Sequence, residues 1–451
     1  MLSATTAAPS WKQLLRYVIP AASAMVLFSL YTVIDGILVS HGVSESALTS
    51  VNISLPFINV LSGVSILLSM GASTLCAFAL GRGKKKEAEE IFTQTVVVMA
   101  VLSAAITVGV LFFAEELALF LGAGPQTLEN AVIYLRIVSL FSVCFILSYC
   151  LEVMVKVDDS PVLATVGVAV AAVVHVGLAY VFIFHFHWGV AGSALATGLA
   201  QLCSLLVFLA YFLGKKSDLK FRRFPFRLKT LLRSLPLGVA DCSIEFMLGF
   251  LTVLYNNLIF LFFGESYQTI YPVISYLSLL VFMVMQGIAQ GMMPLVSVAV
   301  GKGDQKVIRF YFLRSLVLVV GAEALIVAAC LLFPQNFAAV LLSPDSPLFH
   351  QAVSALRQYA LSYLLAGINI LLAGFFTALG HGRASCLLSL GRGFALLPLS
   401  ILALSYLTGG QGIWIAALAG EGLSFLLGLT LLHRIRRVPS ALPVRQAETP
   451  T

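Results

Sequence analysis

The sequence predicts an all-α polytopic membrane protein of twelve transmembrane helices, in two six-helix lobes related by a pseudo-two-fold axis along the membrane normal. Three observations support this fold. The 451 residues are 60% apolar and only 10% charged, whereas about 25% of residues are charged in soluble domains. The second half of the chain repeats motifs of the first. Lysine and arginine are concentrated in alternate connections between the apolar segments.

Twelve segments are long and apolar enough to form helical spans, which need about 20 residues each. Six of them fall in each half of the chain. The expected spans are 14–41, 49–80, 91–115, 131–156, 161–186, 190–213, 233–263, 268–300, 308–333, 353–380, 383–407 and 411–433.

Short motifs carry the repeat. The sequence GRGK at 81–84 recurs as GKGD at 301–304, and GVAGSALA at 189–196 recurs as GIWIAALA at 412–419. An even number of spans per copy returns the chain to its starting side, so the two copies share one orientation. Parallel repeats of this kind are typical of transporters, and we expect the binding site between them.

The basic residues predict the orientation. The connections after every second span contain or border lysine and arginine, and the alternate connections contain none. By the positive-inside rule we expect a multi-pass plasma membrane protein with both termini in the cytoplasm. The net charge of +7 is spread over short loops, which argues against nucleic-acid binding. The basic positions are 82–86, Lys156, 215–233, 302–309, Arg383 and 434–437.

We divide the chain into a first lobe (1–214), a basic cytoplasmic linker (215–232), a second lobe (233–437) and a disordered tail (438–451). The seven cysteines fall within or beside apolar spans at unrelated spacings and predict neither disulfides nor a metal site. We expect a monomer in the lipid bilayer that carries a small organic molecule and needs no cofactor beyond its coupling ion.

Motifs in both halves, in order across residues 11–435, identify the chain as similar to the multidrug and toxic compound extrusion (MATE) family, and most to its bacterial branch of small drug exporters. The resemblance implies a bacterial protein with a V-shaped bundle and a central cavity open alternately to each side. It also implies export of organic compounds against entry of protons or sodium. The motifs are 31–40, Pro56, 134–136, 182–184, 189–197, 235–236, Pro272, 290–291, 378–380, Arg392 and 412–414.

Asp35 matches the cation-coupling aspartate of the family. An ionised carboxylate at the centre of a membrane helix costs about 2.5 to 3.5 kcal/mol, so such an acid faces a cavity or carries a proton. A structural hydrogen bond is the alternative. Thr197 matches a family threonine, whereas His175 and Ala179 replace an asparagine and an aspartate. This makes sodium less expected, and His175 either shares the proton with Asp35 or is a neutral histidine bonded to a backbone carbonyl.

In the second lobe, Asp241 and Glu245 are spaced i, i+4 and share one helical face. Glu245 lies within one position of a glutamate that couples cations in some family members, and Asn369 replaces the matching aspartate. We therefore expect Glu245 to serve coupling or to bind a charged substrate. Asp241 is a cavity candidate, unless it lies nearer the cytoplasmic end.

The remaining candidates are aromatic, amide and paired charged groups. Tyr31, Phe57, Tyr255 and Tyr276 are candidates to stack on a cationic substrate, with packing or lipid contact as the alternative. Gln290 is assigned to the same cavity. Arg392 is expected to form a structural pair with Glu421 or another acid, because burial of an unpaired charge would be too costly.

The leading hypothesis is a secondary-active antiporter that exports cationic or amphipathic organic compounds and is coupled to proton entry. A sodium-coupled exporter and a lipid or metabolite flippase remain alternatives with the same fold. A membrane-embedded transferase is less favoured because the chain lacks paired acidic motifs. No Walker motif or Ser-His-Asp set stands out, so we expect a transporter not powered by ATP, and not an enzyme.

Overall fold

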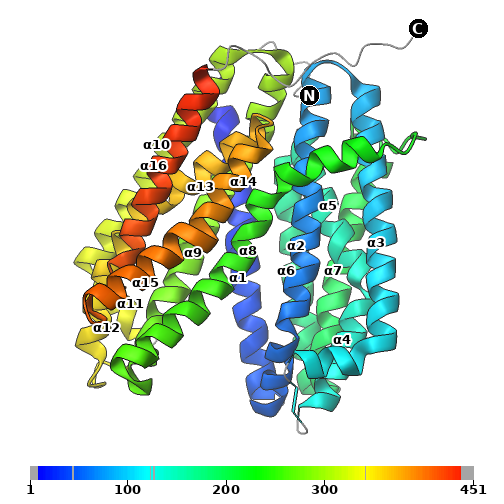
Figure 1. Ribbon diagram of the computed structural model, residues 1–451. Helices are drawn as coiled ribbons and strands as arrows, with labels where there is room; N and C mark the ends of the chain where they lie inside the picture. The colour runs from blue at the N-terminus through cyan, green and yellow to red at the C-terminus, as the bar shows by residue number, and fades with distance from the viewer. Residues whose placement is uncertain (1–8, 43–44, 122, 125–126, 341, 438–451) are drawn as a thin grey trace.

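The chain forms two helical lobes that meet at one end and separate toward the other (Figure 1). The computed structural model describes residues 9–42, 45–121, 123–124, 127–340 and 342–437, without the side chains of 28–33, 35–37, 39–42, 45–49, 52, 245, 248, 265, 268–269 and 436–437. The first lobe contains α1 (Trp11–Gly42), α2 (Glu45–Gly81), α3 (Lys85–Phe120), α4 (Leu128–Leu140), α5 (Ser142–Val157), α6 (Pro161–Tyr180), the π-helical η1 (Val181–His185) and α7 (Gly189–Leu213).

The second lobe repeats this plan with additional short helices. It contains α8 (Leu228–Phe263), η2 (Glu265–Ile270), α9 (Tyr271–Lys302), α10 (Gln305–Leu332), α11 (Pro334–Ala339), α12 (Phe349–Ala360), α13 (Tyr363–Ala378), α14 (Gly382–Gly391), the π-helical η3 (Arg392–Leu396), α15 (Leu397–Leu407), η4 (Gln411–Ile413) and α16 (Ala416–Arg437).

The helices have the length and composition of membrane spans. Within the described part of the chain, nine helices are long and apolar enough to cross a membrane, or eleven if each of two bent pairs is one span. Helix α1, many of whose side chains lie outside the described set, is the remaining expected span. The predicted all-α, two-lobe arrangement of twelve spans is confirmed.

Two expected spans are not straight. The segment predicted at 131–156 is divided into α4 and α5, which are bent by 50°, and the segment predicted at 353–380 is divided into α12 and α13, bent by 42°. A serine lies at each break and donates to the carbonyl three residues earlier, Ser139 to Arg136 and Ser362 to Tyr359. Such hydroxyls compete with the helical hydrogen bonds and bend helices.

Equivalent glycines end the second span of each lobe. Gly83 and Gly303 both have positive φ, 74° and 75°. The residue after each donates its backbone N–H back five positions, from Lys84 to Ala79 and from Asp304 to Ala299. Glycine adopts this left-handed conformation without a Cβ penalty, which is why it ends helices here. The sequence repeat at these positions is therefore also a structural repeat.

The lobes touch through α1 against α9 and through α2 against α8 and α9. Glycines allow their backbones to approach closely. A Cβ at Gly71 would collide with the carbonyl oxygen of Ser234, and a Cβ at Gly238 would collide with that of Leu67. Small residues at helix contacts are the usual means of close packing in membranes, where the hydrophobic effect between helices is weak.

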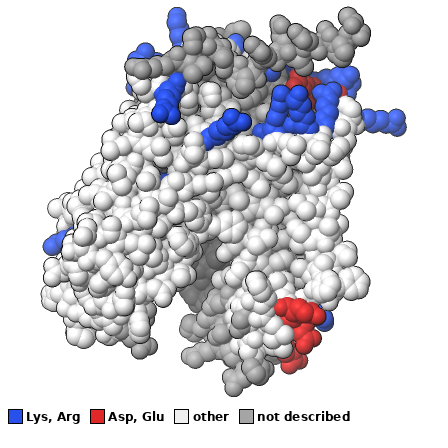
Figure 2. Space-filling view, viewed as in Figure 1, with Lys and Arg blue, Asp and Glu red and all other residues white. Residues whose placement is uncertain are grey.

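The end at which the lobes meet is also the basic end of the molecule. Lysine and arginine side chains gather there, and the surface is hollowed between the lobes toward the opposite end (Figure 2). The start of α1, the end of α16 and the connection from α7 to α8 all lie at this basic end (Figure 1).

The connection between the lobes is docked on the first lobe. The Asp158 carboxylate accepts hydrogen bonds from the backbone N–H groups of Asp218 and Leu219, at 3.0 to 3.2 Å. Further along, Gln94 of α3 exchanges two hydrogen bonds with the backbone of Arg227. These contacts continue to the start of α8 at Leu228, five residues before the predicted second lobe begins.

Candidate functional site

A cavity lies between the two lobes and, together with the solvent onto which it opens, spans about 1230 Å³. It is bounded by α1, α2, α5, α6 and α7 of the first lobe and by α8 and α9 of the second. Serine, glutamine and two acidic side chains interrupt an otherwise apolar wall. The lining residues are Ala24, Met25, Ile58, Ser62, Ser65, Ile66, Phe145, Ser148, Tyr149, Glu152, Val168, Ala171, Gln201, Ser204, Asp241, Ile244, Phe282, Met283, Gln286 and Gln290.

The two cavity carboxylates come from different lobes. Glu152 of α5 accepts a hydrogen bond from Lys156 one turn away, with 2.8 Å between Oε1 and Nζ. Asp241 of α8 accepts a hydrogen bond from the Gln286 amide of α9 at 2.6 Å. Its second oxygen, Oδ2, has no hydrogen-bond partner among the described residues. The wall therefore presents a paired carboxylate on one side and a carboxylate with unused acceptor capacity on the other.

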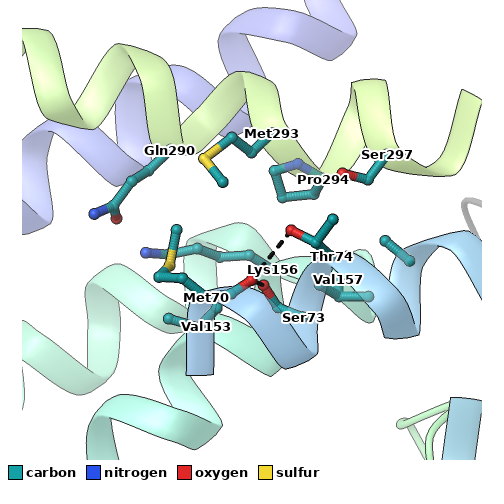
Figure 3. Close-up of a pocket in the computed structure, with 11 residues that line it drawn as sticks. Met70, Ser73, Thr74, Val153, Lys156, Val157, Gln290, Met293, Pro294 and Ser297 are labelled. Atoms are coloured by element: carbon teal, nitrogen blue, oxygen red, sulfur yellow. Dashed lines mark hydrogen bonds between the residues drawn. The ribbon is translucent and has the colours of Figure 1, made fainter. Parts of the chain in front are cut away.

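A smaller space of about 310 Å³ adjoins this cavity. Gln290 lines both, and the smaller space is otherwise formed by α2, α5 and α9. Figure 3 shows Lys156 beside Met70 and facing Gln290 and Met293 of α9. Lys156 lies in the last turn of α5 and borders the next connection, as expected, but its side chain is held inside the bundle and is only 3% exposed. A four-residue spacing from Glu152 lets the two charges compensate each other within α5.

In the first lobe, two of the predicted coupling residues are in contact. His175 of α6 and Thr197 of α7 are both buried, and the imidazole Nε2 lies 3.1 Å from the Thr197 hydroxyl. That hydroxyl also donates to the Ser193 carbonyl at 3.0 Å. The contact joins α6 to α7 next to α1, the helix that contains Asp35.

Three predicted residues lie outside the described side chains. Tyr31 and Asp35 are positions on α1, and Glu245 is a position on α8. Their predicted roles therefore stay predictions.

In the second lobe, three predicted residues that do not line the cavity contact one another. The Arg392 guanidinium donates to both carboxylate oxygens of Glu421, from Nε at 2.9 Å and from Nη2 at 2.7 Å. Asn369 donates from Nδ2 to the same carboxylate at 2.7 Å. Arg392 and Glu421 thus form the buried pair that the sequence allows, and Asn369 is joined to them.

None of the predicted aromatic residues whose side chains the structure describes lines this cavity. Tyr255 does not line the cavity. It is fully buried within the second lobe, where its ring stacks on Tyr271 with 4.7 Å between centroids. Phe57 is 7% exposed and does not line the cavity either. Tyr276 lines a separate space of about 660 Å³ between α8, α9 and α12. Aromatic rings pack in lobe interiors and also line binding sites. The residue type alone therefore does not show whether an aromatic side chain packs in the core or contacts a ligand.

The sequence did not predict that Glu152 and Gln286 line the cavity or that Lys156 lines the adjoining space. A usable signal was present, because opposite charges four residues apart inside an apolar segment are a compensated intramembrane pair and mark a cavity or a bundle interior. In the part of the chain that the structure describes, no group of three or more histidine, cysteine, aspartate or glutamate residues is placed to hold a metal ion.

Comparison with known proteins agrees with this architecture. The MatE family model matches residues 20–181 and 243–402, one segment in each lobe. The multidrug export protein MepA of Staphylococcus aureus is 21% identical over 437 residues, covering 95% of this chain and 94% of MepA. MepA of Staphylococcus saprophyticus is 23% identical over 427 residues, covering 91% and 92%.

Solved structures of MATE transporters have the same fold. A MATE protein in complex with MaL6 superimposes with a TM-score of 0.88 at 20% identity, covering 94% of this chain and 96% of that one. An outward-facing multidrug resistance MATE family transporter of the MOP superfamily gives 0.87 at 20% identity, with the same coverage. Because the family model matches both lobes around the shared cavity, this chain belongs to the MATE family of membrane transporters.

Proposed function

We propose that this protein exports small organic cations with apolar bodies, and that proton entry drives the export through alternating access of the central cavity. The observation that carries the proposal is the cavity lining. It combines two carboxylates with methionine, phenylalanine and aliphatic side chains. Apolar walls with a few placed polar groups are typical of small-molecule sites. A ligand that is cationic at one end and apolar elsewhere complements both parts of this wall.

Asp241 is the proposed partner of the substrate charge. Gln286 satisfies only one of its oxygens, and the other has no hydrogen-bond partner among the described residues. A buried carboxylate oxygen without a partner is costly, so a ligand N–H donor or ammonium group placed there would recover that cost. Glu152 already has Lys156 as its partner and contributes less to charge recognition.

The orientation follows from the basic end. Lysine and arginine are enriched on the cytoplasmic side of membrane proteins, so we assign the basic end in Figure 2 to the cytoplasm. The cavity then opens to the outside, and both termini lie in the cytoplasm of a bacterial plasma membrane. The relatives named above are bacterial multidrug export proteins, which supports the direction of transport and the class of substrate. We propose that a single chain carries out the whole cycle.

Protons are favoured over sodium by the first-lobe chemistry. Sodium prefers several oxygen ligands, whereas His175 stands where the family has an asparagine and contacts Thr197 through a ring nitrogen. Imidazole can exchange a proton near neutral pH. A pH gradient of one unit supplies about 1.4 kcal/mol per proton, which sustains about a tenfold concentration ratio of a monovalent cation exchanged one for one.

A flippase for anionic lipids is less favoured. Such cargo would need cationic groups available inside the bundle. Lys156 and Arg392, the buried cations of the described residues, each form an ion pair with a carboxylate.

The test is transport of a fluorescent lipophilic cation into inside-out proteoliposomes under separately imposed pH, sodium and voltage gradients. A pH gradient alone should drive accumulation, and a sodium gradient alone should not. Asp241→Asn should reduce the preference for the cation over a neutral analogue of the same shape. Glu116→Gln, an exposed acid on α3, is the matched control and should leave that preference unchanged. Sodium-driven transport at equal pH would overturn the proposal.

A further inference from the structure

Four polar side chains from four segments meet in the interior of the second lobe. Glu323 comes from α10, Asn369 from α13, Arg392 from η3 and Glu421 from α16, and none is more than 4% exposed. Arg392 and Asn369 both donate to the Glu421 carboxylate. Glu421 is therefore fully compensated, by one guanidinium and one amide.

Glu323 is not compensated in the same way. One oxygen, Oε1, accepts a hydrogen bond from the backbone N–H of Gly367, where the absence of a Cβ allows the carboxylate to approach the helix. The other oxygen, Oε2, has no hydrogen-bond partner among the described residues, and neither has Asn369 Oδ1, two residues along the same helix from Gly367.

The charges in this group do not balance. Arg392 and Glu421 both lie close enough to interact electrostatically with Glu323, but the single guanidinium is already engaged with Glu421 at 2.7 Å. An ionised carboxylate buried without a counter-charge costs several kcal/mol. A proton on Glu323 removes that charge and supplies an O–H donor, which an acceptor such as an amide oxygen can satisfy.

The group lies directly behind the wall of the central cavity. The Phe282 ring lines both the central cavity and the separate space between α8, α9 and α12, and it lies 5.7 Å from the Arg392 guanidinium. Ser278 and Tyr359 line that second space. The Ser278 hydroxyl lies 2.8 Å from the Tyr363 hydroxyl, deeper in the lobe. The hydroxyl groups of Ser278 and Tyr363 therefore lead from this space into the interior of the second lobe.

We propose that Glu323 is a proton-binding carboxyl group of the second lobe, and that Arg392, Glu421 and Asn369 form the fixed polar surroundings that make a proton its preferred occupant. Binding forms one O–H bond between a carboxylate oxygen of Glu323 and a proton from water, and release breaks that bond and returns the proton to water. The transport role of the site rests on the proton coupling proposed above, but the binding of the proton does not.

The test is infrared difference spectroscopy of the purified full chain in lipid, following the C=O stretching band of protonated carboxyl groups while pH is stepped. The wild type should show a protonated buried carboxyl band near neutral pH that shifts on exchange into D₂O. Glu323→Gln should lose this band, and Glu116→Gln should keep it. Glu323→Asp, which keeps an acid at the site, should retain a displaced band and controls for a general change in folding.

The proposal is overturned if the band persists in Glu323→Gln, or if sodium at fixed pH abolishes the band in the wild type. Transport of the same samples separates the two proposals. Proton-driven transport with an unchanged band in Glu323→Gln contradicts the Glu323 site alone. Loss of the band in Glu323→Gln, together with sodium-driven transport by the wild type, contradicts the proposed function and leaves the site in place.

Discussion

The contact between α1 and α9 leads to a quantitative prediction for Gly291→Ala. A Cβ at Gly291 would lie 2.6 Å from Cα of Val18 and 2.9 Å from the Tyr17 carbonyl oxygen, whereas ordinary contacts begin at 3.4 Å. The two helices would have to separate by about 1 Å. Overpacking of this kind costs about 1 to 3 kcal/mol. This cost destabilises the conformation in which the lobes meet at the basic end. A conformation in which the lobes separate at that end is not destabilised.

Gly291→Ala should therefore shift the population toward opening at the basic end by about 5- to 150-fold. The assay is the rate at which a membrane-impermeant maleimide labels Ser297→Cys, in a background without the seven native cysteines. Ser297 is 1% exposed and lines the space between the lobes shown in Figure 3. In the orientation proposed above, inside-out vesicles present the basic end to the reagent.

The matched control is Gly321→Ala on α10, where an added Cβ would meet nothing within 4 Å. It should label at the parent rate. The reasoning is refuted if Gly291→Ala labels no faster than the parent, or if Gly321→Ala accelerates labelling equally.

Three further predictions concern charged residues of the first lobe. Lys156→Met leaves the Glu152 carboxylate without its 2.8 Å partner and should lower the free energy of unfolding by about 3 kcal/mol. The loss should be measurable as a lower melting temperature in detergent, and adding Glu152→Gln should restore most of the lost stability. An unchanged melting temperature in Lys156→Met would show that the ion pair does not stabilise the fold. Asp158→Asn weakens the hydrogen bonds that two backbone N–H groups of the linker donate to this side chain. The linker should then detach more often, and trypsin should cut within 215–227 faster. An unchanged cleavage rate would show that this contact does not hold the linker. Asp35→Asn should abolish pH-gradient-driven transport in proteoliposomes, and undiminished transport would remove Asp35 as the main coupling residue.

Much of the fold was predictable because bilayer thickness and the positive-inside rule constrain a sequence strongly. The repeated glycines at 83 and 303 marked equivalent helix ends. The bends at 139–142 and 361–362 were not predicted, because no proline marks them and a serine in an apolar run is ordinary. At each bend a serine hydroxyl bonds to the backbone of the preceding turn.

The sequence predicted the site residues where a buried charge required an oppositely charged partner. Arg392 required a buried acid, and Glu421 is one. The sequence could not show that Tyr255 stacks inside the second lobe, because an aromatic residue in a span fits a core and a cavity equally well. Lys156 lies in the last turn of α5, from which a long side chain usually reaches the membrane surface. Its pairing with Glu152 holds it inside instead.

The most direct test of the central claim, that one cavity exchanges protons for an organic cation, is to follow internal pH while substrate is added. Proteoliposomes would start with equal pH on both sides, with the voltage clamped by potassium and valinomycin. Antiport predicts that the lumen becomes alkaline as the cation enters, since each entry is matched by proton exit. Accumulation of the cation at constant internal pH would contradict it.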